Sequence, residues 1–92
     1  MAEVEWTNEA KANIEEIRRG EGDELVRAIM QAVHTISFHP WDGIVVPEVG
    51  LDYVREIKID SHRVIYQILV LPTRIRILGV FHEADSFQNN DE

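Results

Sequence analysis

The sequence predicts an α+β fold of element order β-α-α-β-β-β, in which an N-terminal helical hairpin packs on one face of a twisted antiparallel sheet. Two observations predict it. Apolar residues recur at helical spacing between residues 9 and 36, whereas residues 51–82 form three β-rich segments separated by short turns. Because each of these elements has an apolar face, the hairpin and the sheet are expected to cover one another.

The length and composition predict one small domain. A chain of 92 residues that is 45% hydrophobic can bury one core but not two. We expect a single domain over residues 1–85 and a frayed acidic tail over residues 86–92. The lack of cysteine excludes disulfides and thiolate metal sites. No apolar run could span a membrane and the acidic N-terminus does not resemble a signal peptide, so a cytoplasmic location is expected.

The net charge of −8 is unevenly distributed along the chain. Between Tyr53 and His82, five arginines and lysines stand against two acidic residues. The overall charge argues against a protein whose whole surface binds nucleic acid. The local basic excess is compatible with an anion site, and equally with strands that simply carry their outward charges as Arg and Lys.

The first strand and helix are predicted over the N-terminal residues. Residues 3–6 (EVEW) alternate as a short strand, and Thr7 or Asn8 can cap the helix that follows. One face of this helix carries Ala10, Ile14 and Ile17. Gly20 can supply the left-handed residue that ends it.

A second helix and a loop complete the N-terminal half. Asp23 is a plausible N-cap for the second helix. Its broad apolar stripe consists of Leu25, Val26, Ile29, Met30, Val33 and Ile36. Segment 39–50 contains two prolines and two glycines, so it is expected to return the chain to the sheet as a loop.

The C-terminal half predicts an antiparallel meander with two different faces. The three strands are expected within residues 51–59, 62–71 and 74–82. The face expected against the helices carries Ile57, Ile59, Val64, Tyr66, Ile68, Val70, Ile75, Ile77, Gly79 and Phe81. The opposite face mixes polar and aliphatic residues, which favours a half-open groove. It carries Glu56, Lys58, Arg63, Ile65, Gln67, Leu69, Arg76, Leu78, Val80 and His82.

The turn positions predict which residues face one another across the sheet. A first turn centred between residues 60 and 61 places Lys58 opposite Arg63, and a second centred between residues 72 and 73 places Arg63 opposite His82. These three residues would form one row on the groove face. Glu56 would lie diagonal to Arg63, and a β-bulge would break the pairing.

Such a row of cations would need an anion among its members. Glu56 can offset one charge, and a phosphate could offset the others. An arginine beside a histidine can act on a phosphodiester, because the arginine stabilises charge on phosphorus while the histidine transfers a proton. The alternative is more common: cations decorate an exposed sheet face, and Arg63 with Glu56 is a surface pair worth about 0–1 kcal/mol.

The sequence does not predict a metal site or a cofactor. His34 and His39 do not have the spacing of metal ligands. His62 alternates with the residues expected to face the helices, but it stands at the start of a strand and is expected to be a turn residue. There is no glycine-rich phosphate loop and no serine or cysteine nucleophile motif.

The order and spacing of five segments resemble those of the RelE/ParE superfamily of toxins from toxin–antitoxin modules, which include plasmid stabilisation proteins. The segments are WTNEAKANIEEI, FHPWDG, VREIKI, HRVIYQI and IRILGVFHEA, within about residues 4–85. The resemblance implies the fold predicted above. It also implies a toxin that is neutralised by a cognate antitoxin wrapped around it.

The resemblance implies one of two activities. RelE-like members cut messenger RNA in the ribosomal A site without a metal, whereas ParE-like members inhibit DNA gyrase and are not nucleases. The match to RelE-like enzymes implies that Arg63 contacts the scissile phosphate and that His82 is the general acid. Lys58 and Glu56 would assist. A histidine is also common in the last strand of ParE-like members, so His82 does not distinguish the activities.

The leading hypothesis from the sequence is a ribosome-dependent endonuclease that acts on ribosome-bound mRNA. The alternatives are a gyrase inhibitor that acts by protein binding, and a non-toxic relative that only binds an antitoxin-like partner. After His82 the chain supplies acids where the superfamily carries basic residues, and only Phe87 could stack on a base. The sequence does not indicate the oligomeric state.

Overall fold

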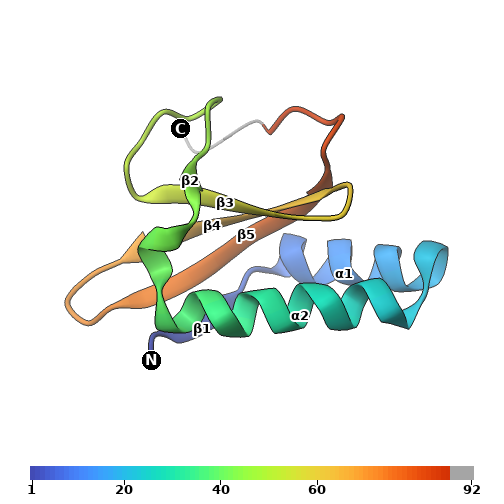
Figure 1. The fold of residues 1–92 in the computed structure, drawn as a ribbon, viewed down its shortest axis with the longest axis horizontal. Coiled ribbons are helices and arrows are strands. Elements are labelled where there is room, and N and C mark those ends of the chain that lie inside the picture. Colours follow the sequence, from blue (N-terminus) through green and yellow to red (C-terminus); the bar gives the residue numbers. More distant parts are fainter. Residues whose placement is uncertain (88–92) are drawn as a thin grey trace.

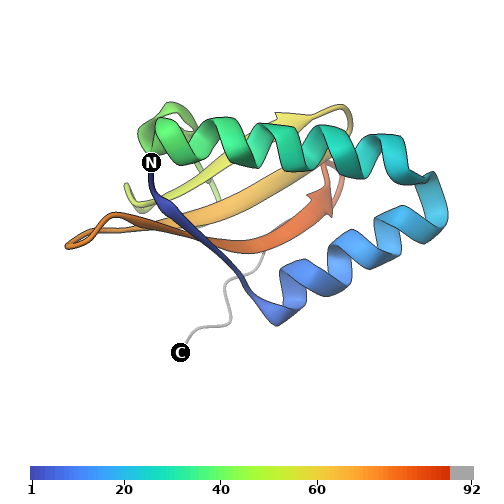
Figure 2. The same cartoon turned by 90° about the horizontal axis from the view of Figure 1, so that it is seen from below.

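The computed structural model describes residues 1–87, in which a helical hairpin covers one face of a five-stranded sheet (Figures 1 and 2). The predicted α+β fold class is confirmed. The elements are β1 (Glu3–Trp6), α1 (Asn8–Glu21), α2 (Asp23–Phe38), the 3-10 helix η1 (Pro40–Asp42), β2 (Ile44–Val45), β3 (Val54–Ile59), β4 (His62–Leu69) and β5 (Arg74–His82). The strand order across the sheet is β1-β5-β4-β3-β2.

The sheet differs from the prediction at its two edges. β1 pairs with β5 in parallel, so the antiparallel pairing is confined to β2, β3, β4 and β5. β2 is a two-residue edge strand inside the segment that was expected to be a loop. Two residues are too few for an alternating pattern to be recognised, so the sequence did not indicate this strand.

α1 begins where the sequence predicted. Thr7 is the N-cap, and its hydroxyl oxygen accepts a hydrogen bond of 3.1 Å from the Ala10 N–H. The same hydroxyl donates to the Ile77 carbonyl at 2.8 Å. The start of the hairpin is therefore fastened to β5.

The junction between the helices lies two residues later than predicted. α1 continues through Gly20 to Glu21, and Gly22 takes the positive φ of 93° that ends it. Glycine adopts this conformation without a Cβ clash. Gly22 also precedes α2, so Asp23 is the first helical residue and not the cap. Neither helix of residues 1–87 is long and apolar enough to cross a membrane.

The main core lies between the hairpin and the sheet. α1 packs on β5, and α2 lies over β3 (Figure 2). The residues of β4 predicted to face the helices are buried there, and they are Val64, Tyr66 and Ile68. The helices contribute Ala10, Ile14, Ile17, Val26, Ile29, Val33 and Ile36. The helical and strand periodicities identified these residues correctly, whereas Met30, which was expected on the same stripe of α2, is 44% exposed.

Tyr66 also anchors the segment that leads to β2. Its hydroxyl donates to the Pro40 carbonyl at 2.7 Å and accepts from the Gly43 N–H at 3.2 Å. A Cβ on Gly43 would collide with this hydroxyl and would lie 2.9 Å from the Glu56 carbonyl oxygen. Glycine therefore permits the close approach of this segment to the sheet.

Two features change the predicted register between β4 and β5: the turn is centred between residues 71 and 72 and not between 72 and 73, and a β-bulge follows it in β5. Arg63 faces Phe81, and His82 faces His62. Ile65 pairs with Gly79 and Tyr66 with Ile77, so the residue between them in β5 has no partner. Because of this extra residue, Leu78, each later side chain of β5 points to the face of the sheet opposite to the one predicted. Val80 therefore joins the core beneath the helices, whereas Phe81 lies on the opposite face.

Among residues 1–87, apolar side chains partly fill the face of the sheet opposite the helices, where a half-open groove was expected. Val46, Val54 and Ile65 form a second buried cluster there. Partly buried residues complete it, namely Val49, Leu78, Phe81 and Phe87. This cluster explains why the second face carries so many aliphatic residues.

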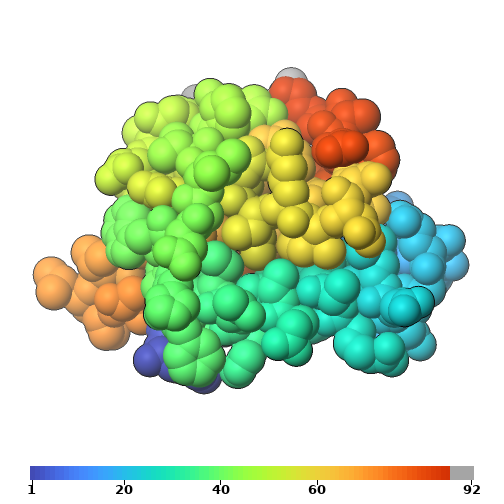
Figure 3. All heavy atoms as spheres, viewed as in Figure 1, coloured from blue at the N-terminus to red at the C-terminus, as the bar shows by residue number. Residues whose placement is uncertain are grey.

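The first residues of the expected tail contribute to this second cluster. The rings of Phe81 and Phe87 lie 5.7 Å apart, and the Phe87 N–H donates to Glu48 at 3.1 Å. In Figure 3 the C-terminal residues (red) adjoin the green segment that precedes β3. The rest of the tail, residues 88–92, lies outside the described residues.

The turn between β4 and β5 projects from the body of the molecule (orange in Figures 1 and 3). It is centred on Leu71 and Pro72, since Leu69 pairs with Arg74. Val70, which was expected in the core, lies in this turn and is 60% exposed, and Leu71 is 94% exposed.

Candidate functional site

Arg63 is the buried charge around which the candidate site is built. It is the second residue of β4, between Lys58 of β3 and Phe81 of β5, and only 6% of it is exposed. Its neighbours in β4, His62 and Val64, face the helices, so the Arg63 side chain points to the opposite face. The predicted pairing of Lys58 with Arg63 and the predicted direction of Arg63 are both confirmed.

Two carboxylates hold the Arg63 guanidinium. Its Nε donates to Glu56 Oε1 at 2.6 Å, while Nη1 and Nη2 donate to the two oxygens of Glu48 at 2.9 and 2.8 Å. Nη1 also donates to the Asp85 carbonyl at 3.2 Å. The contact with Glu48 is the planar, two-pronged arrangement that suits arginine better than lysine. We refer to Arg63, Glu48 and Glu56 as the Arg63 cluster.

The cluster carries more negative than positive charge. Hydrogen bonds from Arg63, and then from the Phe87 N–H, lower the pKa of Glu48 from 4.5 to about 2. The same contacts with Glu48 and Glu56 raise the pKa of Arg63 above its ordinary value. Glu48 and Arg63 are therefore both charged at neutral pH, and each stabilises the charge of the other.

The ion pair between Arg63 and Glu56 is buried and does not lie on the surface. Glu56 was expected to lie diagonal to Arg63, and it does, but it is only 3% exposed. The Arg63–Glu56 pair is thus a buried ion pair, for which removal of one partner is expensive. The interpretation of these residues as exposed decoration was wrong.

Glu48 is the member of the cluster that the sequence did not indicate. It lies in the turn after β2, where no strand periodicity indicates the direction of a side chain. The one available signal was indirect: a buried arginine needs a second carboxylate, and segment 39–50 contains few acids.

His82 does not join the predicted row with Lys58 and Arg63. The bulge at Leu78 turns it to the helix side of the sheet, where its ring lies 5.6 Å from that of His62. His82 is exposed, and its Nδ1 accepts a hydrogen bond of 3.1 Å from the Ala84 N–H. Lys58 remains on the Arg63 face and is exposed.

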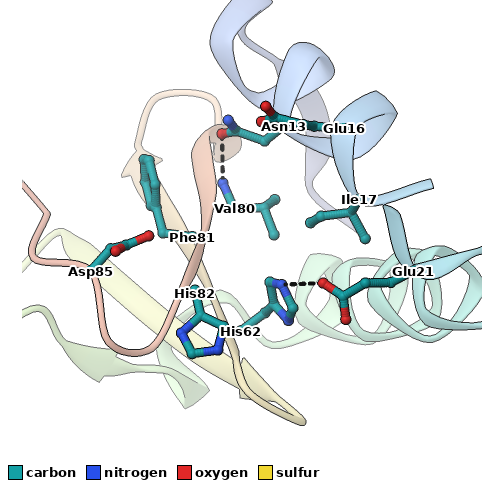
Figure 4. Close-up of a pocket in the computed structure, with 9 residues that line it drawn as sticks. All are labelled: Asn13, Glu16, Ile17, Glu21, His62, Val80, Phe81, His82 and Asp85. Atoms are coloured by element: carbon teal, nitrogen blue, oxygen red, sulfur yellow. Dashed lines mark hydrogen bonds and ion pairs between the residues drawn. The ribbon is translucent and has the colours of Figure 1, made fainter. Parts of the chain in front are cut away.

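The two histidines line a pocket of about 270 Å³ beneath α1 (Figure 4). His62 is a buried strand residue and not a turn residue, and its Nε2 lies 3.2 Å from Glu21 Oε2 at the end of α1. On the other side of the pocket, the Asn13 side chain accepts a hydrogen bond of 3.0 Å from the Val80 N–H. The pocket is therefore a junction that fastens α1 to the ends of β4 and β5.

The arrangement separates the groups that phosphodiester chemistry would combine. The guanidinium of Arg63 is occupied by carboxylates, and His82 lies on the other face of the sheet. Among residues 1–87 no group of three or more His, Asp or Glu side chains is placed to hold a metal ion. The Arg63 cluster connects β3, β4, the turn before β3 and residues 85–87.

The fold and the sequence together identify the family of this chain. Residues 4–87 match the family model described as the ParE toxin of the type II toxin–antitoxin system parDE. The chain therefore belongs to the ParE toxin family, within the RelE/ParE superfamily of toxins. None of the curated proteins matches the sequence significantly.

Solved structures of this superfamily share the fold. The chain is 20% identical to a chain of the RelBE2 toxin–antitoxin complex from Mycobacterium tuberculosis, with a TM-score of 0.71 over 88% of this chain and 96% of that one. A YoeB/ParE toxin from Agrobacterium tumefaciens is 15% identical, with a TM-score of 0.69 over 87% and 96%. A chromosomal ParDE system from P. aeruginosa is 18% identical, with a TM-score of 0.65 over 89% and 96%.

Proposed function

We propose that this toxin acts by binding a protein target and not by cutting RNA, and that the target is DNA gyrase. The observation that carries the proposal is the state of Arg63. A nuclease needs this guanidinium at the phosphate, yet two carboxylates engage it and 6% of it is exposed. The match to the ParE family model supports the same choice.

The charge of the chain supports a protein target as well. Nucleic-acid binding draws its affinity from cations that neutralise phosphates. This chain has a net charge of −8, and its most buried arginine belongs to a cluster with one positive and two negative groups. A protein target places no such demand on net charge.

A cognate antitoxin is the second partner that we propose. Two of the similar solved structures are described as RelBE2 and ParDE toxin–antitoxin assemblies. By analogy, a small antitoxin would bind this chain and suppress its toxicity. Co-expression with the product of the neighbouring gene should restore growth and yield a complex that co-purifies.

The endonuclease hypothesis is the competing candidate. Lys58 and Arg63 are directly opposed on one face, and His82 is exposed at the end of β5. To assemble a nuclease, Arg63 would have to leave Glu48, and the substrate would have to reach both faces of the sheet. The two hypotheses therefore make opposite predictions about RNA.

The test measures both activities with the same protein. We expect expression to arrest growth with transcripts intact, and the purified chain to inhibit supercoiling by gyrase. Arg63→Lys keeps the positive charge but removes the two parallel N–H donors of the guanidinium. Arg27→Ala, at an exposed arginine of α2, is the matched control. Transcript ends that appear in translated regions, and disappear with an Arg63→Lys variant that circular dichroism shows to be folded, would instead establish the nuclease. Normal growth at full expression would favour the non-toxic relative.

A further inference from the structure

Four hydrogen-bond donors converge on the carboxylate of Glu48. Two are the Nη1 and Nη2 groups of Arg63, at 2.9 and 2.8 Å. The other two come from the C-terminal segment: the Phe87 N–H at 3.1 Å and the Ser86 hydroxyl at 3.5 Å. Donors from β4 and from residues 86–87 thus surround one oxyanion, and three of the four point to the same oxygen, Oε2.

Arg63 is the buried and fixed part of this donor set, whereas Ser86 is exposed and Phe87 is half-buried. Arg63 is 6% exposed and is fixed from behind through Nε by Glu56. Phe87 is held by its packing against Phe81. Glu48, by contrast, belongs to a turn and its side chain is 27% exposed, so the donor set lies within reach of solvent.

We propose that Arg63, the Phe87 N–H and the Ser86 hydroxyl form an oxyanion receptor, and that Glu48 closes it as an internal ligand. The receptor takes the phosphate or carboxylate group of an external ligand when the Glu48 side chain turns away. Both groups offer oxygens that match the fork of an arginine and a backbone N–H. The contact between Glu48 and Arg63 is in this sense autoinhibitory.

The internal ligand has two physical advantages over an external one. It is attached to the chain, so it acts at an effective concentration of about millimolar or above. Its low pKa of about 2 also keeps it ionised, so a moderate fall in pH does not open the receptor. Displacement therefore requires a concentrated or multiply bonded oxyanion, or a movement of the turn that carries Glu48.

The proposal goes beyond the function proposed above and does not depend on it. A gyrase inhibitor and a nuclease could both contain a closed oxyanion receptor. Binding of a small anion is measured without gyrase, ribosomes or an antitoxin, so the two proposals fail separately.

Glu48→Ala tests the receptor because it removes the internal ligand and leaves all four donors. We would titrate the variant with inorganic phosphate, and separately with acetate, against chloride at matched ionic strength. The Phe87 amide resonance is the local readout. Asp52→Ala is the matched control, because Asp52 is an exposed carboxylate paired with another arginine, Arg55, at 2.9 Å.

We expect the Phe87 amide of the Glu48→Ala variant to shift saturably with phosphate, acetate or both. The midpoint should be at least about tenfold lower than in the unchanged protein and in Asp52→Ala, since the attached competitor is gone. The two anions then distinguish a phosphate receptor from a carboxylate receptor. Equal midpoints in all three proteins, or no response to either anion, would overturn the proposal.

A folding defect of the variant would not prevent the test. If Glu48→Ala is unfolded in chloride, circular dichroism in phosphate and in acetate replaces the titration. Recovery of the folded signal in either anion, at concentrations that do not stabilise Tyr66→Phe, supports the receptor, because a ligand that binds only the folded state stabilises it, whereas general salt exclusion would stabilise both variants. Equal unfolding in all three salts contradicts it.

Discussion

The guanidinium of Arg63 meets the carboxylate of Glu48 edge to edge, through two hydrogen bonds of 2.8 and 2.9 Å. This contact joins the centre of the sheet to the turn before β3, and through Glu48 to the Phe87 N–H. A residue that the sequence marked as a candidate phosphate ligand is therefore also the point at which three distant segments meet. The first two predictions test this dual position.

Removal of the Arg63 side chain should destabilise the fold strongly. Arg63→Ala leaves Glu56, which is 3% exposed, as a buried and unpaired carboxylate. We expect a loss of about 3–5 kcal/mol in the free energy of unfolding, measured by urea titration. Arg27→Ala, at an exposed position, should change it by less than about 0.5 kcal/mol. Similar losses for both variants would contradict a structural role for the cluster.

Glu48 should make stability depend on pH in the acidic range. Its pKa is about 2 in the folded chain and 4.5 ordinarily, so folding favours the ionised form. The stabilisation is complete above about pH 4.5 and is lost as the pH falls towards 2. Allowing for partial exposure, we expect the advantage of the unchanged protein over Glu48→Gln to shrink by about 1–2 kcal/mol across this range. A pH-independent difference in urea denaturation would exclude this coupling.

The Tyr66 hydroxyl should contribute measurably to stability. Tyr66 is fully buried, and Tyr66→Phe leaves the Pro40 carbonyl and the Gly43 N–H without their partner. We expect a loss of about 1–3 kcal/mol and faster hydrogen exchange at the Gly43 amide. Tyr53→Phe, at a residue that is 43% exposed, serves as the control. An unchanged exchange rate at Gly43 would show that the contact is not maintained in solution.

The projecting turn should tolerate, and even favour, a glycine at position 71. Leu71 has a φ of +66° and is 94% exposed, so its side chain adds strain without packing. We expect Leu71→Gly to raise the free energy of unfolding by up to about 1 kcal/mol, because glycine accepts this conformation. Val70→Gly, at a neighbour with an ordinary φ, should lower it. If both substitutions destabilise equally in thermal unfolding, Leu71 is not strained.

Several features could be predicted because they depend on residues close together in the chain. The cap of α1 at Thr7 follows from the chemistry of one side chain and the N–H groups next to it. The pairing of Lys58 with Arg63 follows from a tight turn of known position. The burial of Val64 and Tyr66 follows from strict alternation.

The wrong faces predicted for Val80, Phe81 and His82 have a common cause in the last strand. The bulge at Leu78 adds one residue to β5, and a shift of one residue moves every later side chain to the other face. His82 therefore lies beside His62 and not beside Arg63. A bulge carries no periodic signal, so alternation alone places His82 on the wrong face.

The sequence by itself determined the helical hairpin, the helix-facing side of β3 and β4, the direction of Arg63 and the resemblance to the RelE/ParE superfamily, because local periodicity and turn chemistry encode them. Only the tertiary structure decided what Arg63 binds. Glu48 reaches it from a turn fifteen residues away, and Phe87 closes the cluster from the end of the chain. A buried charge must be paired, but which carboxylate pairs with it depends on how distant segments pack.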